Sequence, residues 1–128
     1  MRSTASNSRR SDDRERRLVE AAGLDVDGVT SFQLGFDLAV PRASGIYVIA
    51  DLRGPLYVGK SGHLRRRFAE HFENTHNRLL HLALAAPAGR PTFSWLTTTP
   101  EDLTSTEVRY IRALHPLCNQ HLFIHSNH

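Results

Sequence analysis

Apolar residues are rare at the start of the chain and become regular only after the first dozen positions. We therefore expect residues 1–13 to be a disordered tail, because a segment with so little apolar content cannot bury a core. Asp12–Ala22 is typical of a short helix with one weakly apolar side, which Gly23 would end. We predict a disordered tail and short helix over residues 1–22 and one folded domain over residues 23–128.

From residue 24 to residue 42 apolar and polar positions alternate without clear boundaries. The apolar residues of this segment are numerous enough to cover one side of a core, but they predict no defined helix or strand. Pro41 ends any regular structure there. Residues 45–50 and 55–59 are rich in β-branched and aromatic residues and flank a short loop that contains Gly54. Two such runs predict a β-hairpin.

Beyond the hairpin the apolar period changes from two to about 3.6 residues. Leu64, Phe68 and Phe72 fall on one helical stripe, and Ser61 is placed to cap the start of that helix. Prolines divide the rest of the chain. The pattern predicts a helix over residues 77–86, a third strand over residues 92–98 and a helix from Pro100 to His115.

Composition is ordinary for one globular domain: 128 residues, 40% hydrophobic and 23% charged. No apolar stretch approaches the roughly 20 residues that a membrane-spanning helix needs. The start of the chain lacks the apolar core of a secretory signal. Cys118 is the only cysteine, which excludes an internal disulfide and favours a reducing cytoplasm.

The basic residues are almost all arginine: the chain has fifteen arginines and a single lysine, Lys60. The formal net charge is +3. Arginine presents a planar fork of donors that suits phosphate, so the excess agrees with a nucleic-acid partner. Codon bias in a GC-rich genome would explain the arginines equally well, but not the place of Lys60. Apart from His71, the histidines show no ligand spacing with cysteine or acid, which argues against a structural zinc site.

One carboxylate interrupts the apolar face of the last predicted helix. Glu107 shares that face with Leu103, Tyr110, Ile111 and Leu114. A carboxylate on an inward-facing stripe loses hydration and must be compensated by a cation, a metal or hydrogen bonds. Glu107 is therefore a candidate ligand for a hard divalent cation such as Mg²⁺. At the edge of the stripe it could instead reach water or pair with an arginine.

Arg67 and His71 are four residues apart, so they lie one above the other beside the apolar stripe of their helix. Their side chains would point along the sheet edge, toward the predicted hairpin. A salt bridge from Arg67 to Glu70 or Glu73 explains this arginine equally well.

The predicted hairpin carries Tyr47 and Tyr57, two of the three tyrosines of the chain. Most strand tyrosines serve packing. Gly59 follows closely and precedes Lys60, and a glycine in a strand lets a ligand or another backbone approach. We assign four residues of this region to nucleic-acid binding, although a solvated basic face also explains the two arginines: Gly59, Lys60, Arg65 and Arg66.

The order of these residues resembles the signature of the GIY-YIG nuclease family. Its parts are Gly45-Ile46-Tyr47, Tyr57-Val58-Gly59, in which valine replaces the middle isoleucine as the family allows, and Arg67. The run YVGKSGHLRRRFAEHF is similar to the corresponding segment of the nucleotide-excision-repair incision subunit and of small stand-alone members. The resemblance covers residues 43–121.

The family also has a glutamate on a later helix and an asparagine beyond it. Glu107 and Asn119 fill those places, and residues 115–119 match the usual proline-then-asparagine ending. The resemblance implies an α+β fold with a three-stranded antiparallel sheet flanked by helices. It also implies a metal-dependent endonuclease that cuts DNA with one Mg²⁺ or Mn²⁺, held by Glu107. The implied catalytic residues are Tyr47, Tyr57, Lys60, Arg67, His71, Glu107 and Asn119.

In such a site Arg67 would donate to a non-bridging phosphate oxygen, and Tyr47 would hydrogen-bond the phosphate or the water. Tyr57, Lys60 and His71 remain competing candidates for the general base. Asn119 would orient its neighbours.

The expected partner is DNA, with specificity supplied by a homodimer or a partner subunit. Two alternatives stay open: a non-catalytic nucleic-acid-binding module of the same fold, and an RNA-cleaving nuclease. The sequence does not discriminate among repair, restriction, mobile-element maintenance and a toxin role.

Overall fold

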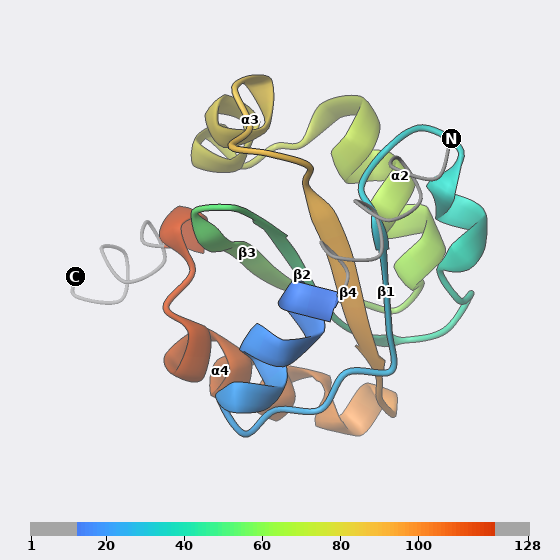
Figure 1. Ribbon diagram of the computed structural model, residues 1–128. Coiled ribbons are helices and arrows are strands. Elements are labelled where there is room, and N and C mark those ends of the chain that lie inside the picture. The colour runs from blue at the N-terminus through green and yellow to red at the C-terminus, as the bar shows by residue number, and fades with distance from the viewer. Residues whose placement is uncertain (1–12, 120–128) are drawn as a thin grey trace, which may run out of the picture.

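The computed structural model describes residues 13–119, so nearly all of the predicted tail and the residues after Asn119 lie outside the described part of the chain. A four-stranded antiparallel sheet runs through the centre of the molecule (Figure 1). Its strands are β1 (Gly28–Ser31), β2 (Gly45–Asp51), β3 (Gly54–Ser61) and β4 (Thr92–Thr97). They lie in the order β1-β4-β2-β3, so β1 and β3 are the edges.

The expectation of three strands is wrong, because β1 adds a fourth. β1 is four residues long, too short for its alternation to stand out along the chain. β1 is a strand because it pairs with β4: Gly28 lies opposite Trp95, and Ser31 lies opposite Thr92. The indole of Trp95 covers Gly28 so closely that a Cβ there would collide with the ring.

The β-hairpin of β2 and β3 is confirmed, and its strands are longer than predicted. Asp51 pairs with Gly54, so only Leu52 and Arg53 form the turn. Gly54 has a φ of 103°, a backbone conformation that favours glycine. The register of the pair shifts between Ile49 and Ala50, which is the signature of a β-bulge.

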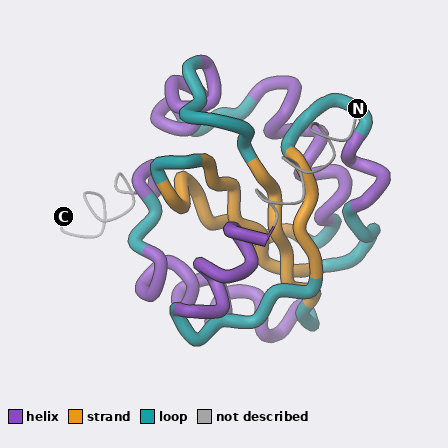
Figure 2. Tube along the Cα trace, in the orientation of Figure 1, coloured by secondary structure: helices purple, strands orange, loops and turns teal. Residues whose placement is uncertain are grey.

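Helices cover both faces of the sheet (Figures 1 and 2). One face is covered by α2 (Leu64–Asn74), α3 (Arg78–Ala85) and the 3₁₀ turn η1 (Phe36–Ala39). Its core consists of Phe32, Val40, Tyr47, Ile49, Leu56, Leu64, Phe68, Leu80, Phe93 and Cys118.

The other face is covered by the helix over residues 13–21 and by α4 (Leu103–Leu114). Its core consists of Val19, Leu24, Ile46, Val48, Val58, Tyr110 and Ile111. Strand β2 supplies both cores because successive side chains of a strand point to opposite faces. Tyr47 and Ile49 enter one core, and Ile46 and Val48 enter the other.

The cap of α2 differs from the prediction. Ser61 is still part of β3, and its Oγ accepts a hydrogen bond from the His63 amide at 2.9 Å. His63 is the N-cap, because its Nδ1 accepts from the Arg66 amide at 3.2 Å. Of the predicted apolar stripe of α2, Leu64 and Phe68 are buried, whereas Phe72 is 41% exposed.

The last helix begins as a 3₁₀ turn, η2 (Pro100–Asp102), and continues as α4. It ends at His115, which has a φ of 48° and donates its amide hydrogen to Ile111 O. A further 3₁₀ turn, η3 (Leu117–Asn119), then brings the chain to the open side of β3. No helix among residues 13–119 has the length and apolar character needed to cross a membrane.

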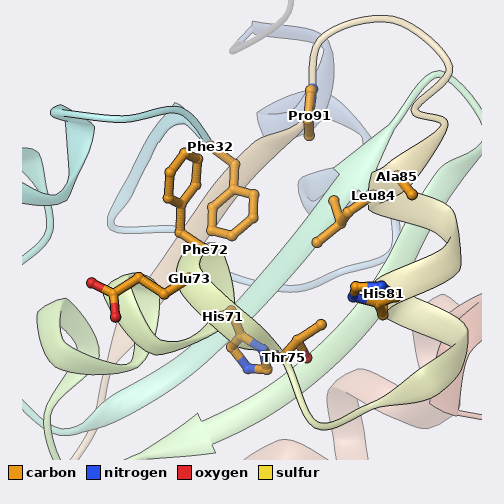
Figure 3. Close-up of a pocket in the computed structure, with 9 residues that line it drawn as sticks. All are labelled: Phe32, His71, Phe72, Glu73, Thr75, His81, Leu84, Ala85 and Pro91. Atoms are coloured by element: carbon orange, nitrogen blue, oxygen red, sulfur yellow. Dashed lines mark hydrogen bonds between the residues drawn. The ribbon is translucent and has the colours of Figure 1, made fainter.

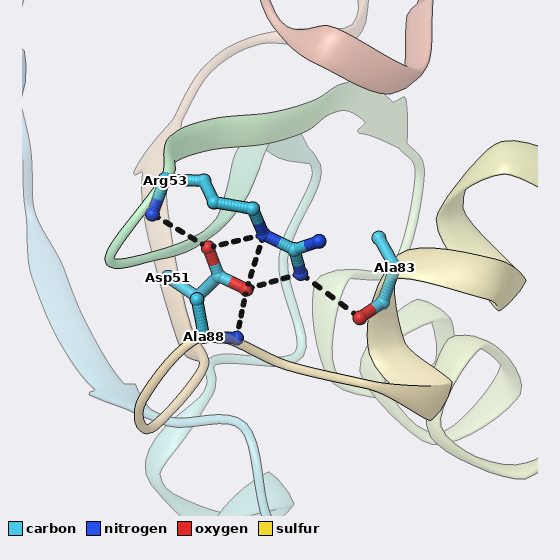
Figure 4. Close-up of polar contacts among 4 residues, drawn as sticks. All are labelled: Asp51, Arg53, Ala83 and Ala88. Carbon is cyan, nitrogen blue, oxygen red and sulfur yellow. Dashed lines mark hydrogen bonds and ion pairs between the residues drawn. The ribbon is translucent and has the colours of Figure 1, made fainter.

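A buried carboxylate joins the β2–β3 turn to the connection between α3 and β4 (Figure 4). Asp51 accepts hydrogen bonds from the Arg53 guanidinium, the Arg53 amide and the Ala88 amide, and Arg53 also donates to Ala83 O. Burial alone would raise the pKa of Asp51, but these hydrogen bonds outweigh it and hold the pKa below its ordinary value. The cluster is structural, because its donors and acceptors satisfy one another.

Candidate active site

The residues selected from the sequence converge at the exposed edge of β3, between α2 and α4. Tyr47 and Tyr57 come from the hairpin, Arg67 and His71 from α2, and Glu107 from α4. Lys60 follows on β3 and lies beside Glu107. The antiparallel register places Tyr47 directly opposite Gly59, so both tyrosines and this glycine share one face of the hairpin.

Tyr47 is fully buried at the centre of this group. Its Oη lies 2.6 Å from His71 Nε2. Burial and the neighbouring Tyr57 raise the pKa of Tyr47 far above its ordinary value, and Arg67 opposes this through its charge and a hydrogen bond. Tyr47 is therefore a neutral phenol that can donate one hydrogen bond and accept others.

Gly59 makes room for this phenol. A Cβ built on Gly59 would collide with the hydroxyl and ring of Tyr47. From the sequence we expect Gly59 to let a ligand or another backbone approach. In the structure, the group that approaches Gly59 is the side chain of Tyr47. Gly59 thus shapes the site whether or not it also contacts nucleic acid.

Tyr57 is half-buried, next to Tyr47, with ring centroids 6.1 Å apart. Burial and the negative charge of Glu107 raise the pKa of Tyr57, while Arg67 and a hydrogen bond with Tyr47 lower it. Of the two tyrosines, only Tyr57 lines the adjacent groove.

Arg67 forms the salt bridge that the sequence left open as an alternative. Its Nε lies 2.9 Å from Glu70 Oε1, one turn along α2. The guanidinium also lies close enough to Tyr47 for the two side chains to influence each other's pKa. Both side chains of the ion pair are largely exposed, at 40% and 55%, so the pair is screened and exchangeable. Arg67 is therefore available to an anion.

Glu107 is partly buried and lies beside the only lysine of the chain. Lys60 Nζ is 3.9 Å from Glu107 Oε1 and donates to Thr104 Oγ1 at 2.9 Å. Burial raises the pKa of Glu107, and the charge of Lys60 offsets part of this. Such a carboxylate would gain from a further cation.

Glu107 fits a divalent cation of the hard type. Within residues 13–119 no three His, Cys, Asp or Glu side chains gather at one point. A cation here would have one protein carboxylate and a shell of water, which suits Mg²⁺ because it dehydrates reluctantly and takes few protein ligands.

Asn119 supports the site from the edge of the sheet. It is fully buried, its Oδ1 accepts from the Val58 amide at 2.9 Å, and its Nδ2 donates to Val58 O at 3.0 Å. The side-chain amide thus pairs with edge strand β3 as another strand would. Val58 lies between Tyr57 and Gly59, so Asn119 positions the segment without reaching the groove.

The two flanking arginines of α2 differ. Arg65 donates to Val40 O at 2.8 Å and to Leu38 O at 3.2 Å, so its guanidinium holds the η1 segment against α2. Arg66 is exposed. Their assignment to nucleic-acid binding stays a prediction, and Arg66 is the one with a solvent-facing guanidinium to offer.

The model of the GIY-YIG catalytic domain matches residues 43–119, more than half of the chain. The match spans every residue placed in the site above. The chain belongs to the GIY-YIG family.

Solved structures share this fold. The GIY-YIG N-terminal endonuclease domain of UvrC from Thermotoga maritima, bound to magnesium as its catalytic divalent cation, superposes with a TM-score of 0.53 and 18% identity. The match covers 66% of this chain and 91% of that domain. A point mutant of the same domain, also bound to its catalytic divalent cation, gives a TM-score of 0.53 at 16% identity, with the same coverage. No curated protein sequence matches the chain.

The GIY-YIG site opens into a groove of about 550 Å³. Tyr57, Arg67 and His71 line it together with Thr75 and Asn77, which follow α2. Sequence reasoning missed these last two residues. A signal for Thr75 existed, because it lies four positions after His71 and so one helical turn along the same side.

A smaller cavity of about 260 Å³ shares His71, Glu73 and Thr75 with this groove (Figure 3). His71 and Thr75 lie next to each other in its wall, with Phe32, Phe72 and Leu84 supplying apolar surface. His71 therefore lines both the groove and this partly apolar cavity. Burial and the charge of Arg67 lower the pKa of His71 to about 4, so the imidazole is neutral at pH 7.

Proposed function

We propose that this GIY-YIG domain is a metal-dependent endonuclease that hydrolyses DNA phosphodiester bonds with a single divalent cation, Mg²⁺ or Mn²⁺. The proposal rests on Tyr57, which lines an open groove together with Arg67 and feels the charges of both Arg67 and Glu107. A phosphodiester needs an activated water, a cation for the phosphate oxygens and help for the leaving oxygen, and this group can offer all three.

Glu107 is the residue that would hold the cation, which when bound supplies Lewis-acid stabilisation of a phosphate oxygen and of the leaving 3′ oxygen. Lys60 lies close enough to Glu107 to orient the carboxylate through their 3.9 Å ion pair. Arg67 would exchange its contact with Glu70 for a non-bridging phosphate oxygen, to which its planar fork is suited.

Tyr57 is the general base that the contacts favour among the three candidates. Both ring nitrogens of His71 are engaged, by Tyr47 and Thr75, and Lys60 is directed at Thr104 and Glu107. Tyr57 lines the groove, and the only side-chain hydrogen-bond partner of its hydroxyl among residues 13–119 is Tyr47. Neutralising the charge of Glu107 would remove one of the causes that raise the pKa of Tyr57, which favours the phenolate.

DNA is the proposed substrate, and the exposed cations Lys60 and Arg66 could meet the flanking phosphates. Specificity from a second copy or a partner subunit, and a place in the cytoplasm, remain predictions from the sequence.

The test is nicking of supercoiled plasmid with Mg²⁺, Mn²⁺ or EDTA. We expect metal-dependent nicking that falls about 10²-fold or more in Glu107→Gln, because the variant keeps the shape of the side chain but loses its charge. Glu101→Gln, at an exposed glutamate of η2, is the matched control and should be as active as the wild type.

Parallel digestions of branched DNA and of RNA, with a binding assay in EDTA, separate the alternatives. Cleavage of RNA alone would make the protein a ribonuclease of this fold. Tight binding with no cleavage of any substrate under any metal would instead identify a binding module.

A further inference from the structure

His71 makes two hydrogen bonds whose directions depend on where its single ring proton lies. Nε2 faces Tyr47 Oη at 2.6 Å, and Nδ1 faces Thr75 Oγ1 at 2.9 Å. The neutral imidazole carries a hydrogen on only one of these nitrogens, so one contact uses the ring as donor and the other uses it as acceptor. The partner of one nitrogen therefore selects the tautomer presented to the other.

Thr75 is held firmly enough to make that selection. It is 9% exposed and caps the C-terminal end of α2. Its Oγ1 accepts from the Asn77 amide at 3.3 Å. Asn77 is itself fixed, because its Oδ1 accepts from the Leu80 amide to cap α3 and its Nδ2 donates to Cys118 O.

The hydrogen of the Thr75 hydroxyl decides between the two tautomers. With the hydrogen on Nδ1, Thr75 Oγ1 would accept twice and its own hydrogen would have no acceptor among the described contacts of residues 13–119. With the hydrogen on Nε2, the Thr75 hydroxyl donates to Nδ1 and Nε2 donates to Tyr47 Oη. The hydrogen of Tyr47 is then directed to its neighbour Tyr57. Thr75 lines the groove but is only 9% exposed, so the arrangement that gives its hydrogen an acceptor within the protein is favoured.

We propose that Thr75 is a positioning residue of this site: its hydroxyl donates to His71 Nδ1 and thereby holds His71 as the Nε2–H tautomer, which donates to Tyr47 Oη. Tyr47 Oη then accepts from His71, which leaves the hydrogen of Tyr47 for the neighbouring hydroxyl oxygen of Tyr57. Hydrogen bonds in such a chain polarise one another. The chain from Thr75 through His71 and Tyr47 thus stabilises negative charge on Tyr57.

The consequence for catalysis rests on the proposed function, in which Tyr57 is the base, whereas the tautomer does not depend on any activity. Thr75→Val removes the hydroxyl and keeps the shape, and Thr75→Ser keeps the hydroxyl. The pair separates a hydrogen-bonding role from a packing role.

The first experiment is ¹⁵N NMR of the His71 imidazole in the full chain near pH 7, without metal or nucleic acid. We expect a protonated Nε2 and an unprotonated Nδ1 in the wild type and in Thr75→Ser. In Thr75→Val the two nitrogen shifts should move toward each other as the tautomers mix. A protonated Nδ1 in the wild type overturns the proposal, and so do shifts that are unchanged in Thr75→Val.

The second experiment measures plasmid nicking by the same three proteins. Loss of the donor should lower kcat about tenfold in Thr75→Val, with KM little changed and activity retained in Thr75→Ser. Equal activity of all three proteins would overturn the catalytic part. A wild type that cuts nothing, with the expected tautomer, would refute the nuclease and leave the role of Thr75 in positioning His71 intact.

Discussion

At Gly59 the backbone of β3 approaches the phenol of Tyr47 so closely that no side chain fits between them. The glycine is needed because of this neighbour, and its φ is not in the left-handed region. Tyr47 is in turn held by the stacked ring of Phe93, with centroids 5.2 Å apart, and so cannot retreat without disturbing the core.

Gly59→Ala is therefore expected to destabilise the protein by about 1–3 kcal/mol and to displace the Tyr47 hydroxyl. Gly62→Ala is the matched control, because a Cβ there meets open space. Urea unfolding of both variants measures the difference. Equal free energies of unfolding for the two variants would show that the site is not packed as described.

His71 provides a test at acidic pH. Its pKa is about 4 in the folded protein, against about 6.5 in an unfolded chain. Between these values the unfolded chain binds more protons than the folded one, so stability falls as the pH drops from 6.5 to 4. The loss from this residue is at most about 3 kcal/mol.

A His71→Gln variant should lose less stability than the wild type between pH 7 and pH 4.5, as measured by urea unfolding. His81→Gln, at an exposed histidine, should keep the wild-type pH dependence. Identical slopes for all three proteins would mean that His71 is not buried as a neutral imidazole.

Among the elements, strand β3 stands at the edge of the sheet and would present unpaired backbone groups to solvent. The turn η3 prevents this, since Asn119 satisfies both the amide and the carbonyl of Val58. Val58, which lies between Tyr57 and Gly59, is thereby paired by a residue 61 positions away in the chain.

Asn119→Leu should cost about 2–4 kcal/mol, because it leaves two buried backbone groups without partners. Leu117→Ala, at a half-exposed neighbour in η3, should cost less than about 1 kcal/mol. Thermal or urea unfolding decides, and a near-neutral Asn119→Leu would contradict the pairing.

At the scale of the whole molecule, one hydrophobic core lies on each face of the small sheet. The core that contains Val48 and Tyr110 also includes Val19, from the helix over residues 13–21. Val19 of that helix is fully buried against strands β2 and β3 and helix α4, whereas the adjacent Leu18 is 43% exposed. The domain boundary expected at residue 23 stays a prediction, and the contribution of Val19 to stability bears on it.

We expect Val19→Ala to lower the free energy of unfolding by about 2 kcal/mol and Leu18→Ala to lower it much less. The comparison uses the full chain and urea unfolding. If the two variants are equally stable, the helix does not belong to the cooperative unit.

The family, the hairpin and the order of the helices follow from patterns along the chain. These features are local: the strand alternation, the helical period and the prolines act over neighbouring residues, and the GIY-YIG motif keeps fixed spacings. The same locality explains why Glu107 stood out, since a single carboxylate broke an otherwise apolar helical face.

Other features depend on contacts between segments that are distant in the sequence. β1 exists because β4 pairs with it, and Lys60 meets Thr104 across 44 residues of chain. Asn119 pairs with Val58 across 61 residues, and Asn77 reaches Cys118 across 41. Such contacts depend on how the packed elements bring distant segments together, which no local pattern encodes, and they are what place the groups around Tyr57.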